Sequence, residues 1–354
     1  MIFGVIIAAP RLRVFGRVDK KGFALAAMFF AAAFSAVAQQ DDVSTTQQRA
    51  NQDLSQQGNS DLLITPEQVA RSYAAHAHPF INDPLTQLVK RIPELKKIQP
   101  AADQDALPAI LKKAGDNVDS HLSNIVDLIA REEITLQRSS GKGFSTPLRV
   151  EDNYLILKKP YEAGYELVEY RMDAAGHRLD NIGLNLGFLA THGFAMLCNF
   201  LASAFQRESV FRYLGDQKVG SADAYVVGFA QRPELATQLV NLHGRNGLNY
   251  PMLIQGVAWI DKRNFQIVRM RTDLLAPRPD LALDRQTTEV TFSEVHLAEV
   301  PAALWLPKDV KVYMALQERD SVNGRRTYDR GFRNEHHYSN YRLYRVSVKM
   351  LPGR

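Results

Sequence analysis

Hydrophobic and polar side chains alternate along residues 254–271, in two runs separated by a polar turn at residues 261–264. Alternation with a period of two on either side of such a turn predicts a β-hairpin. In the first run Ala258 and Ile260 lie on one side of the strand, yet Trp259 on the other side is also apolar. The sheet at this hairpin therefore needs some cover on both of its faces.

The same alternation recurs through most of the chain after residue 130. The runs are separated by residues with turn chemistry, most clearly Asn323-Gly324, because both residues tolerate the positive φ of a type I′ turn. Hairpin after hairpin predicts an antiparallel sheet in meander order. The expected strands lie near residues 131–138, 152–158, 165–172, 177–180, 209–214, 222–230, 252–261, 265–273, 287–297, 308–319 and 326–348, and the last is expected to be broken.

Helical patterns precede the strands. In residues 118–131 the apolar side chains Val118, Leu122 and Ile125 recur at spacings of four and three, which is one stripe of a helix. The period then changes to two, so this helix is expected to lead directly into the first strand. Further helices are expected after Pro66, over residues 83–97 and over residues 105–113.

Residues 182–206 carry no formally charged side chain. Glycine and asparagine residues within this stretch argue against a membrane-spanning helix. The spacing instead predicts a helix over residues 194–205 that is apolar around most of its girth, so it must be covered by other elements. One of its faces carries Phe194, Leu197, Leu201 and Phe205.

These patterns predict an α+β fold, namely a curved antiparallel β-sheet (half-barrel) with helices packed on the concave face. The helices at 118–131 and 194–205 are expected to fill the concave side. The other face of the hairpin is expected to be partly exposed to solvent, with the aliphatic parts of the Arg269 and Arg271 side chains lying over Trp259 and Phe265.

The first residues predict export. A basic stretch, a short apolar run and the small residues Ala36-Val37-Ala38 predict a signal peptide at 1–38. We expect a disordered polar linker at 39–62, a helical segment at 63–114 and the half-barrel domain at 115–350. The net charge of +5 falls to about +1 without residues 1–38, so it does not indicate nucleic-acid binding. The expected location is periplasmic or secreted, with no stable transmembrane segment after signal removal.

The order of elements resembles the half-barrel fold of periplasmic carriers that sort outer-membrane lipoproteins, the LolA/LolB/LppX-like superfamily. Residues 209–231 and 254–274 carry this resemblance, through a strand with a glycine-containing turn and a later G-V-A-W-I-D strand. Residues 305–314 and 336–346 are similar to secreted proteins of the Acidobacteria that have no established activity. The resemblance implies a non-enzymatic protein that holds acyl chains in the hollow of the half-barrel.

The sequence offers no catalytic motif and predicts no cofactor. It contains neither G-x-S-x-G nor H-E-x-x-H, and the single cysteine, Cys198, lies in an apolar setting typical of an inert thiol. His336 and His337 are adjacent on an expected strand, so they point to opposite faces and are not expected to share a metal ion.

Two functions from different classes remain open. The first is a non-enzymatic envelope protein that binds a hydrophobic ligand or a lipidated partner. The candidate ligand-binding residues are Phe194, Leu197, Leu201, Phe205, Trp259 and Phe265.

The second function is a protein-interaction or scaffold module of the envelope with a solid core and a basic docking surface. Its candidate residues are Arg333, Tyr341, Arg342 and Arg345, in a C-terminal region where tyrosine and arginine interleave. The expected partners are lipid, a lipoprotein or an anionic envelope component. An enzyme of unassigned type is the least favoured alternative.

Overall fold

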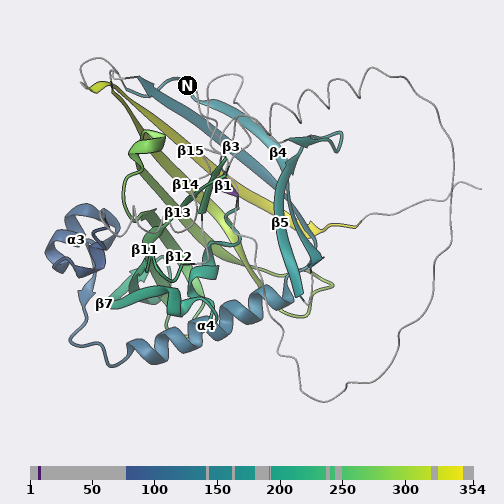
Figure 1. The fold of residues 1–354 in the computed structure, drawn as a ribbon. Helices are drawn as coiled ribbons and strands as arrows, with labels where there is room; N and C mark the ends of the chain where they lie inside the picture. Colours follow the sequence, from purple (N-terminus) through teal and green to yellow (C-terminus); the bar gives the residue numbers. More distant parts are fainter. Residues whose placement is uncertain are drawn as a thin grey trace, which may run out of the picture.

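The computed structural model describes residues 7–8, 77–140, 143–161, 164–179, 191, 193–236, 240–243, 249–319 and 326–345. The expected linker at 39–62, the expected helix after Pro66 and all of the expected signal peptide except residues 7–8 lie outside these ranges. Figure 1 shows the arrangement of the described elements.

One open sheet of twelve antiparallel strands dominates the described residues. Most neighbours in the sheet are also neighbours in sequence, as a meander requires. Two pairings join segments that are distant in sequence, namely β15 with β3 inside the sheet and β2 with β7 at one edge. The spatial order is β2 (Gln99–Pro100), β7 (Ser209–Val219), β8 (Ala222–Gln231), β11 (Ile254–Asp261), β12 (Ile267–Leu274), β13 (Leu283–Val295), β14 (Leu304–Arg319), β15 (Arg326–Leu343), β3 (Leu128–Ser140), β4 (Leu148–Tyr161), β5 (Gly164–Met172) and β6 (Arg178–Leu179).

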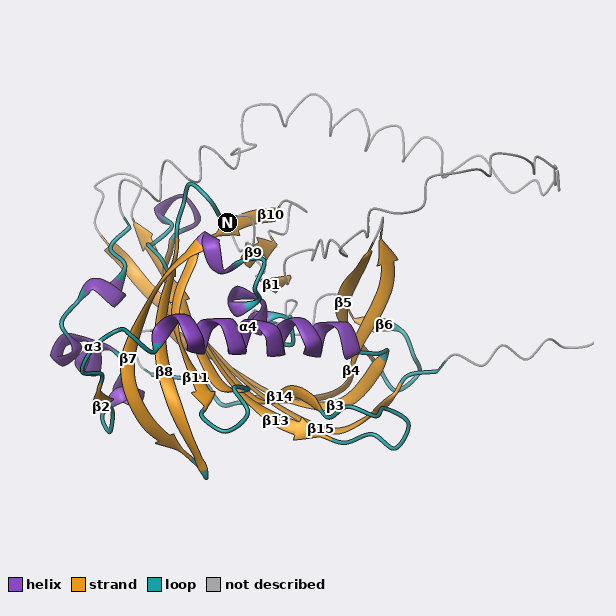
Figure 2. Cartoon of the chain, turned by 90° about the horizontal axis from the view of Figure 1, so that it is seen from below, coloured by secondary structure: helices purple, strands orange, loops and turns teal. Residues whose placement is uncertain are grey.

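The sheet is bent into a half-barrel, and one long helix crosses its concave side (Figure 2). This confirms the predicted fold class. A second, small sheet contains β1 (Ile7–Ala8), β9 (Val240–His243) and β10 (Asn249–Met252). The helices are α3 (Leu85–Arg91), α4 (Leu107–Asn124) and the 3-10 helices η1 (Phe80–Asn82), η2 (Pro93–Leu95), η4 (Leu197–Leu201), η5 (Gln206–Glu208) and η6 (Pro279–Leu281).

The expected helices at 105–113 and 118–131 are a single helix, α4. It buries Ile110, Ala114, Val118 and Leu122, which recur every four residues. It ends earlier than predicted because Ile125 already has an extended backbone, and β3 begins at Leu128. The carboxylate of Asp127 then accepts a hydrogen bond of 2.7 Å from the Lys158 amide of β4, which ties the helix-to-strand turn to the sheet.

The concave core lies between the sheet and α4. This core contains Ala258 and Ile260 of β11 and Met270 of β12, and all three side chains are fully buried. The predicted alternation therefore holds for the inward-facing side chains of this hairpin.

A second core lies on the convex face, which was expected to be partly exposed to solvent. The N-terminal segment with η1, α3 and η2 covers it, and Leu88 and Ile92 pack there in a cluster that also contains Trp259. Trp259 has no exposed surface, and the Arg269 guanidinium lies over its ring at 5.0 Å as expected. The cover comes from a segment whose sequence pattern did not reveal where it would dock.

The long last strand, β15, contains a bulge rather than a break. The pairing register with β3 shifts between Ser339 and Arg342, and Asn340 has a positive φ of 54°. Asparagine tolerates this conformation better than most residues. Among the described helices, none is both long and apolar enough to cross a membrane.

Candidate functional site

Residues 193–202, called the insert below, lie on the concave side and are buried throughout. The predicted helix over 194–205 is not an α-helix. Its hydrogen bonds run from Leu197 to Phe194, from Asn199 to Met196 and from Ala202 to Asn199, which is the three-residue spacing of a 3-10 helix. The buried face was therefore predicted correctly, whereas the backbone type was wrong.

The insert packs against both the sheet and α4. The Phe200 ring stacks on Phe229 of β8, with ring centroids 6.1 Å apart. On the opposite side Gly115 of α4 approaches so closely that a Cβ there would lie 3.2 Å from the Leu201 carbonyl oxygen and 2.7 Å from Ser203 Oγ. A glycine in the middle of a helix lowers its intrinsic stability, and here the absence of a side chain permits this close contact.

A buried polar cluster holds the first residues of the insert. We call Glu132, Tyr154, Glu169, Arg171 and His336 the anchor cluster; they come from β3, β4, β5 and β15. All five are buried. Their charges are therefore compensated by contacts within the protein rather than by water.

An ion pair forms the centre of the anchor cluster. Arg171 donates two hydrogen bonds to Glu132, at 2.6 and 2.7 Å. Tyr338 also donates to Glu132 at 2.7 Å, and His336 Nδ1 lies 2.9 Å from the same carboxylate. Burial raises the pKa of Glu132, but the charge and hydrogen bonds of Arg171 together with the contact to His336 outweigh it and hold that pKa at about 2.

Four groups of the cluster contact Thr191 or the beginning of the insert. Arg171 donates to the Thr191 carbonyl at 2.6 Å, and the Thr191 hydroxyl lies 3.1 Å from His336 Nε2. The Gly193 amide donates to Tyr154 Oη at 3.3 Å. The Ala195 amide donates to Glu169 Oε2, also at 3.3 Å. The segment is thus tied to the sheet by side chains, without strand pairing.

Glu169 is the unusual carboxyl of the cluster. Tyr154 Oη donates to its Oε2, while its Oε1 has no hydrogen-bond partner. Burial raises the pKa of Glu169 to about 7, against the opposing effect of these hydrogen bonds. A carboxyl with this pKa gains or loses its proton near neutral pH.

Thr191, His336 and Glu132 form a hydroxyl–imidazole–carboxylate series, an order also seen in hydrolase triads. Here Arg171 occupies both oxygens of the carboxylate, and Thr191 has no exposed surface. Burial lowers the pKa of His336, which favours its neutral form. These contacts suit the anchoring of a segment, because the hydroxyl has no route to a dissolved substrate.

The six predicted ligand-binding residues do not share one surface. Phe194, Leu197 and Leu201 are buried in the concave core, and the half-buried Phe205 and Phe265 pack against it. Trp259 belongs to the convex core, because it alternates with Ala258 and Ile260 along β11. Phe265 lies beneath Lys113 of α4, whose Nζ is 4.5 Å from its ring, rather than beneath Arg271.

The four predicted docking residues lie on and just after β15. Arg333 and Arg342 are exposed. The Arg333 guanidinium lies 4.2 Å from the Phe144 ring centroid, Tyr341 Oη donates to the Pro307 carbonyl at 2.7 Å, and Arg345 pairs with Glu299. Three of the four therefore have partners within the chain.

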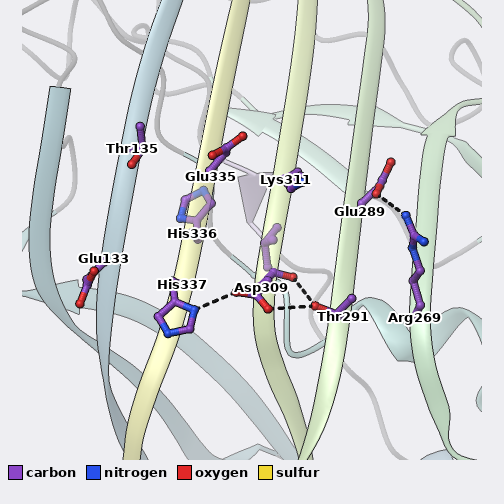
Figure 3. A pocket seen from close by; sticks show the side chains of 11 residues that line it. Glu133, Thr135, Arg269, Glu289, Thr291, Asp309, Lys311, Glu335, His336 and His337 are labelled. Carbon is purple, nitrogen blue, oxygen red and sulfur yellow. Dashed lines mark hydrogen bonds and ion pairs between the residues drawn. The ribbon is translucent and has the colours of Figure 1, made fainter. Parts of the chain in front are cut away.

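The convex face between β12 and β3 is polar and carries a hollow of about 580 Å³ (Figure 3). His337 lies here and forms an ion-pair contact of 2.8 Å with Asp309, whereas His336 points into the core. The two adjacent histidines thus face opposite sides, as predicted. Within the described ranges, no group of three or more His, Cys, Asp or Glu side chains is arranged to hold a metal ion.

Comparisons with known proteins give distant structural neighbours. A domain named as an outer-membrane lipoprotein-sorting protein domain from Vibrio parahaemolyticus has a TM-score of 0.31 and 13% identity, covering 66% of this chain and 92% of that one. A DUF1329 family protein from Desulfovibrio piger has a TM-score of 0.28 and 14% identity, covering 69% and 95%. A LolA superfamily protein from Nitrosomonas europaea has a TM-score of 0.26 and 13% identity, covering 68% and 94%.

All three neighbours match this chain at low identity and with a low TM-score. No protein-family model matches the chain. No curated protein matches it either. The function proposed below therefore rests on the residues of this chain.

Proposed function

We propose that this protein is a non-enzymatic, exported envelope protein that binds an apolar ligand or a lipidated partner in its half-barrel. The ligand would occupy the concave side, where the insert now lies. Export is inferred from the signal pattern at 1–38, which lies almost entirely outside the described residues.

The observation that carries this proposal is the way in which the concave face is covered. Strands β8, β11 and β12 present an apolar inner surface, including Phe229, Ala258 and Met270. The insert covers it without pairing to any strand, and the amides of Gly193 and Ala195 tie its beginning to the anchor cluster. Such a cover can be exchanged for another apolar body without breaking the hydrogen bonds of the sheet.

Energetics favour exchange over simple opening. Burial of a Leu or Phe side chain contributes about 1.5–3 kcal/mol. An insert that left the half-barrel with nothing in its place would expose Phe194, Leu197 and Leu201 together with the surface beneath them. An apolar ligand that takes the place of the insert would keep the inner surface of the sheet out of water. The open form is therefore expected mainly in the presence of ligand.

Two measurements test the proposal. The purified protein is extracted with organic solvent and the extract is analysed for lipids by mass spectrometry. The protein is then titrated with N-phenyl-1-naphthylamine, an uncharged probe that fluoresces in apolar surroundings. The proposal expects saturable probe uptake with displacement by lipid. An empty protein that takes up no probe between pH 5 and 8 would overturn it.

A docking role is the second candidate, because Arg342 and Arg333 are exposed on β15. Arg342→Glu would then abolish capture of an anionic envelope component, while probe uptake would remain unchanged. Equal capture by Arg342→Glu and the native protein would count against this role.

A further inference from the structure

We propose that uptake of the apolar ligand is coupled to the release of one proton from Glu169, so that pH controls whether the insert can leave the half-barrel. This inference rests on the proposed function and assigns a control to the same site. Its geometric basis is that Glu169 is a buried carboxyl that accepts a hydrogen bond from the backbone amide of Ala195 in the insert, while its second oxygen has no partner.

Glu169 lies on β5 and points into the concave core beside the beginning of the insert. Its Oε2 accepts a hydrogen bond from the Ala195 amide at 3.3 Å. Its Oε1 is buried without a partner. The insert therefore contacts one oxygen of this carboxyl, while the other is buried without a hydrogen bond.

The charged form of Glu169 is poorly accommodated in the closed arrangement. A buried carboxylate with one unpartnered oxygen loses hydration that its hydrogen bonds only partly replace. The pKa is accordingly raised to about 7 by burial. Departure of the insert would hydrate the carboxyl and return its pKa toward the ordinary value near 4.3.

The sign of the coupling follows. Between the ordinary pKa and about 7, the closed form holds the proton and the open form does not, so opening releases it. Opening, and with it ligand uptake, therefore becomes easier as pH rises through this window. One proton permits a change in affinity of at most about tenfold per pH unit.

The other titratable groups around Glu169 do not supply this coupling. They are Tyr154 of β4, Glu132 of β3, Tyr341 of β15 and Cys198 of the insert. Burial raises the pKa of both tyrosines and raises that of Cys198 to about 12, so these groups stay neutral. Glu132, with a pKa of about 2, stays ionised.

His336 has the opposite sign. Burial lowers its pKa, so exposure on opening would bind a proton and favour uptake at low pH. Because this contribution is common to variants that keep His336, the ratio of two affinities removes it. The informative quantity is the ratio of the probe Kd of Glu169→Gln to that of the native protein at each pH.

The experiment measures the Kd of N-phenyl-1-naphthylamine from pH 5 to 8 for the native protein, for Glu169→Gln and for the control Glu335→Gln. The glutamine side chain imitates the protonated carboxyl, so the Kd ratio is expected to be only a few-fold at pH 5 and to rise by at least about tenfold between pH 5 and pH 8. Glu335 is exposed on the convex face, and its variant is expected to follow the native protein throughout. A ratio for Glu169→Gln that does not change with pH would overturn the coupling while leaving the proposed function intact.

Absence of probe uptake at every pH would instead contradict the proposed function, and hydrogen exchange would then decide the coupling. The amides of Ala195 and Met196 are compared between native protein and Glu169→Gln at the same pH. Slower exchange in Glu169→Gln at pH 8, with a much smaller difference at pH 5, supports proton control of the insert. Equal exchange at both pH values overturns it.

Discussion

Arg171 and Glu132 form a doubly hydrogen-bonded ion pair, at 2.6 and 2.7 Å, with side chains that are 4% and 0% exposed. The pair joins β5 to β3 across β4 and lies next to the insert. Because the pair lies next to the insert, a change in the charge of either residue is expected to alter the contacts that hold the insert.

We expect Arg171→Met to lower the free energy of unfolding by about 3–5 kcal/mol, because it leaves the Glu132 charge buried without compensation. The double variant Glu132→Gln/Arg171→Met should recover much of that loss, since no uncompensated charge remains. Urea unfolding measures both. The control is Lys112→Met in the exposed pair with Asp116, for which a change under about 1 kcal/mol is expected. A similar small change for Arg171→Met would show that the pair is not buried as described.

His121 of α4 gives a pH dependence of opposite sign to that of Glu169. Neither of its ring nitrogens has a hydrogen-bond partner, and burial lowers its pKa to about 4. The unfolded chain therefore binds a proton at a higher pH than the folded protein does. The neutral His121 side chain therefore contributes roughly 3 kcal/mol to the free energy of unfolding. This contribution is fully present above about pH 6.5 and is lost as pH falls toward 4.

His121→Leu should remove this contribution and raise stability throughout the range, because it replaces an unsatisfied polar ring with an apolar side chain. Unfolding free energies at intervals from pH 4 to 7 provide the comparison. An unchanged slope in His121→Leu would assign the pH dependence to another group.

Leu88→Ala tests the cover on the convex face. Leu88 of α3 is fully buried in the same core as Trp259, so a loss of about 2–5 kcal/mol is expected. Trp259 should also become more accessible to acrylamide quenching. Leu235→Ala is the matched control, because Leu235 is 45% exposed and its loss should change stability by about 0.5 kcal/mol or less. If both variants were equally stable, the N-terminal segment would not be docked on this face.

Phe200→Ala tests whether packing of the insert opposes ligand uptake. Loss of the stacking on Phe229 weakens the closed form more than the ligand-bound form, so the probe should bind at least about tenfold more tightly. The same exposed control, Leu235→Ala, should bind as the native protein does. Weaker probe binding by Phe200→Ala would mean that Phe200 contacts the ligand instead of competing with it.

The strands of the meander could be predicted from sequence because apolar and polar side chains alternate along most of them, whereas β2 and β9 were not predicted. The anchor cluster could not be assembled in the same way. Glu132 shares a strand face with Ile134 and Leu136, which signals an inward charge, but its partners are distant in sequence. His336 is opposite Ile134 only because β15 pairs with β3, and no local pattern specifies that pairing.

The insert shows a different limit of sequence reasoning. The spacing of Phe194, Leu197 and Leu201 correctly identified the buried residues. The backbone type depended on contacts with Glu169 and Arg171, which come from another part of the chain. Tertiary contacts override local helix preference in such a short segment.

A reversible tether tests the central claim most directly. A Cβ on Gly115 would lie 2.7 Å from Ser203 Oγ, so Gly115→Cys/Ser203→Cys can form a disulfide that fastens the residue directly after the insert to α4. The Gln206 side chain, whose Nε2 would lie 2.5 Å from this Cβ, must move aside in the oxidised and the reduced protein alike. The measurement is the uptake of N-phenyl-1-naphthylamine at pH 8 by the oxidised and the reduced protein, with disulfide formation verified by thiol counting. We predict that oxidation suppresses uptake and that reduction restores it. Equal uptake by the fastened and the released protein would show that the apolar ligand does not take the place of the insert.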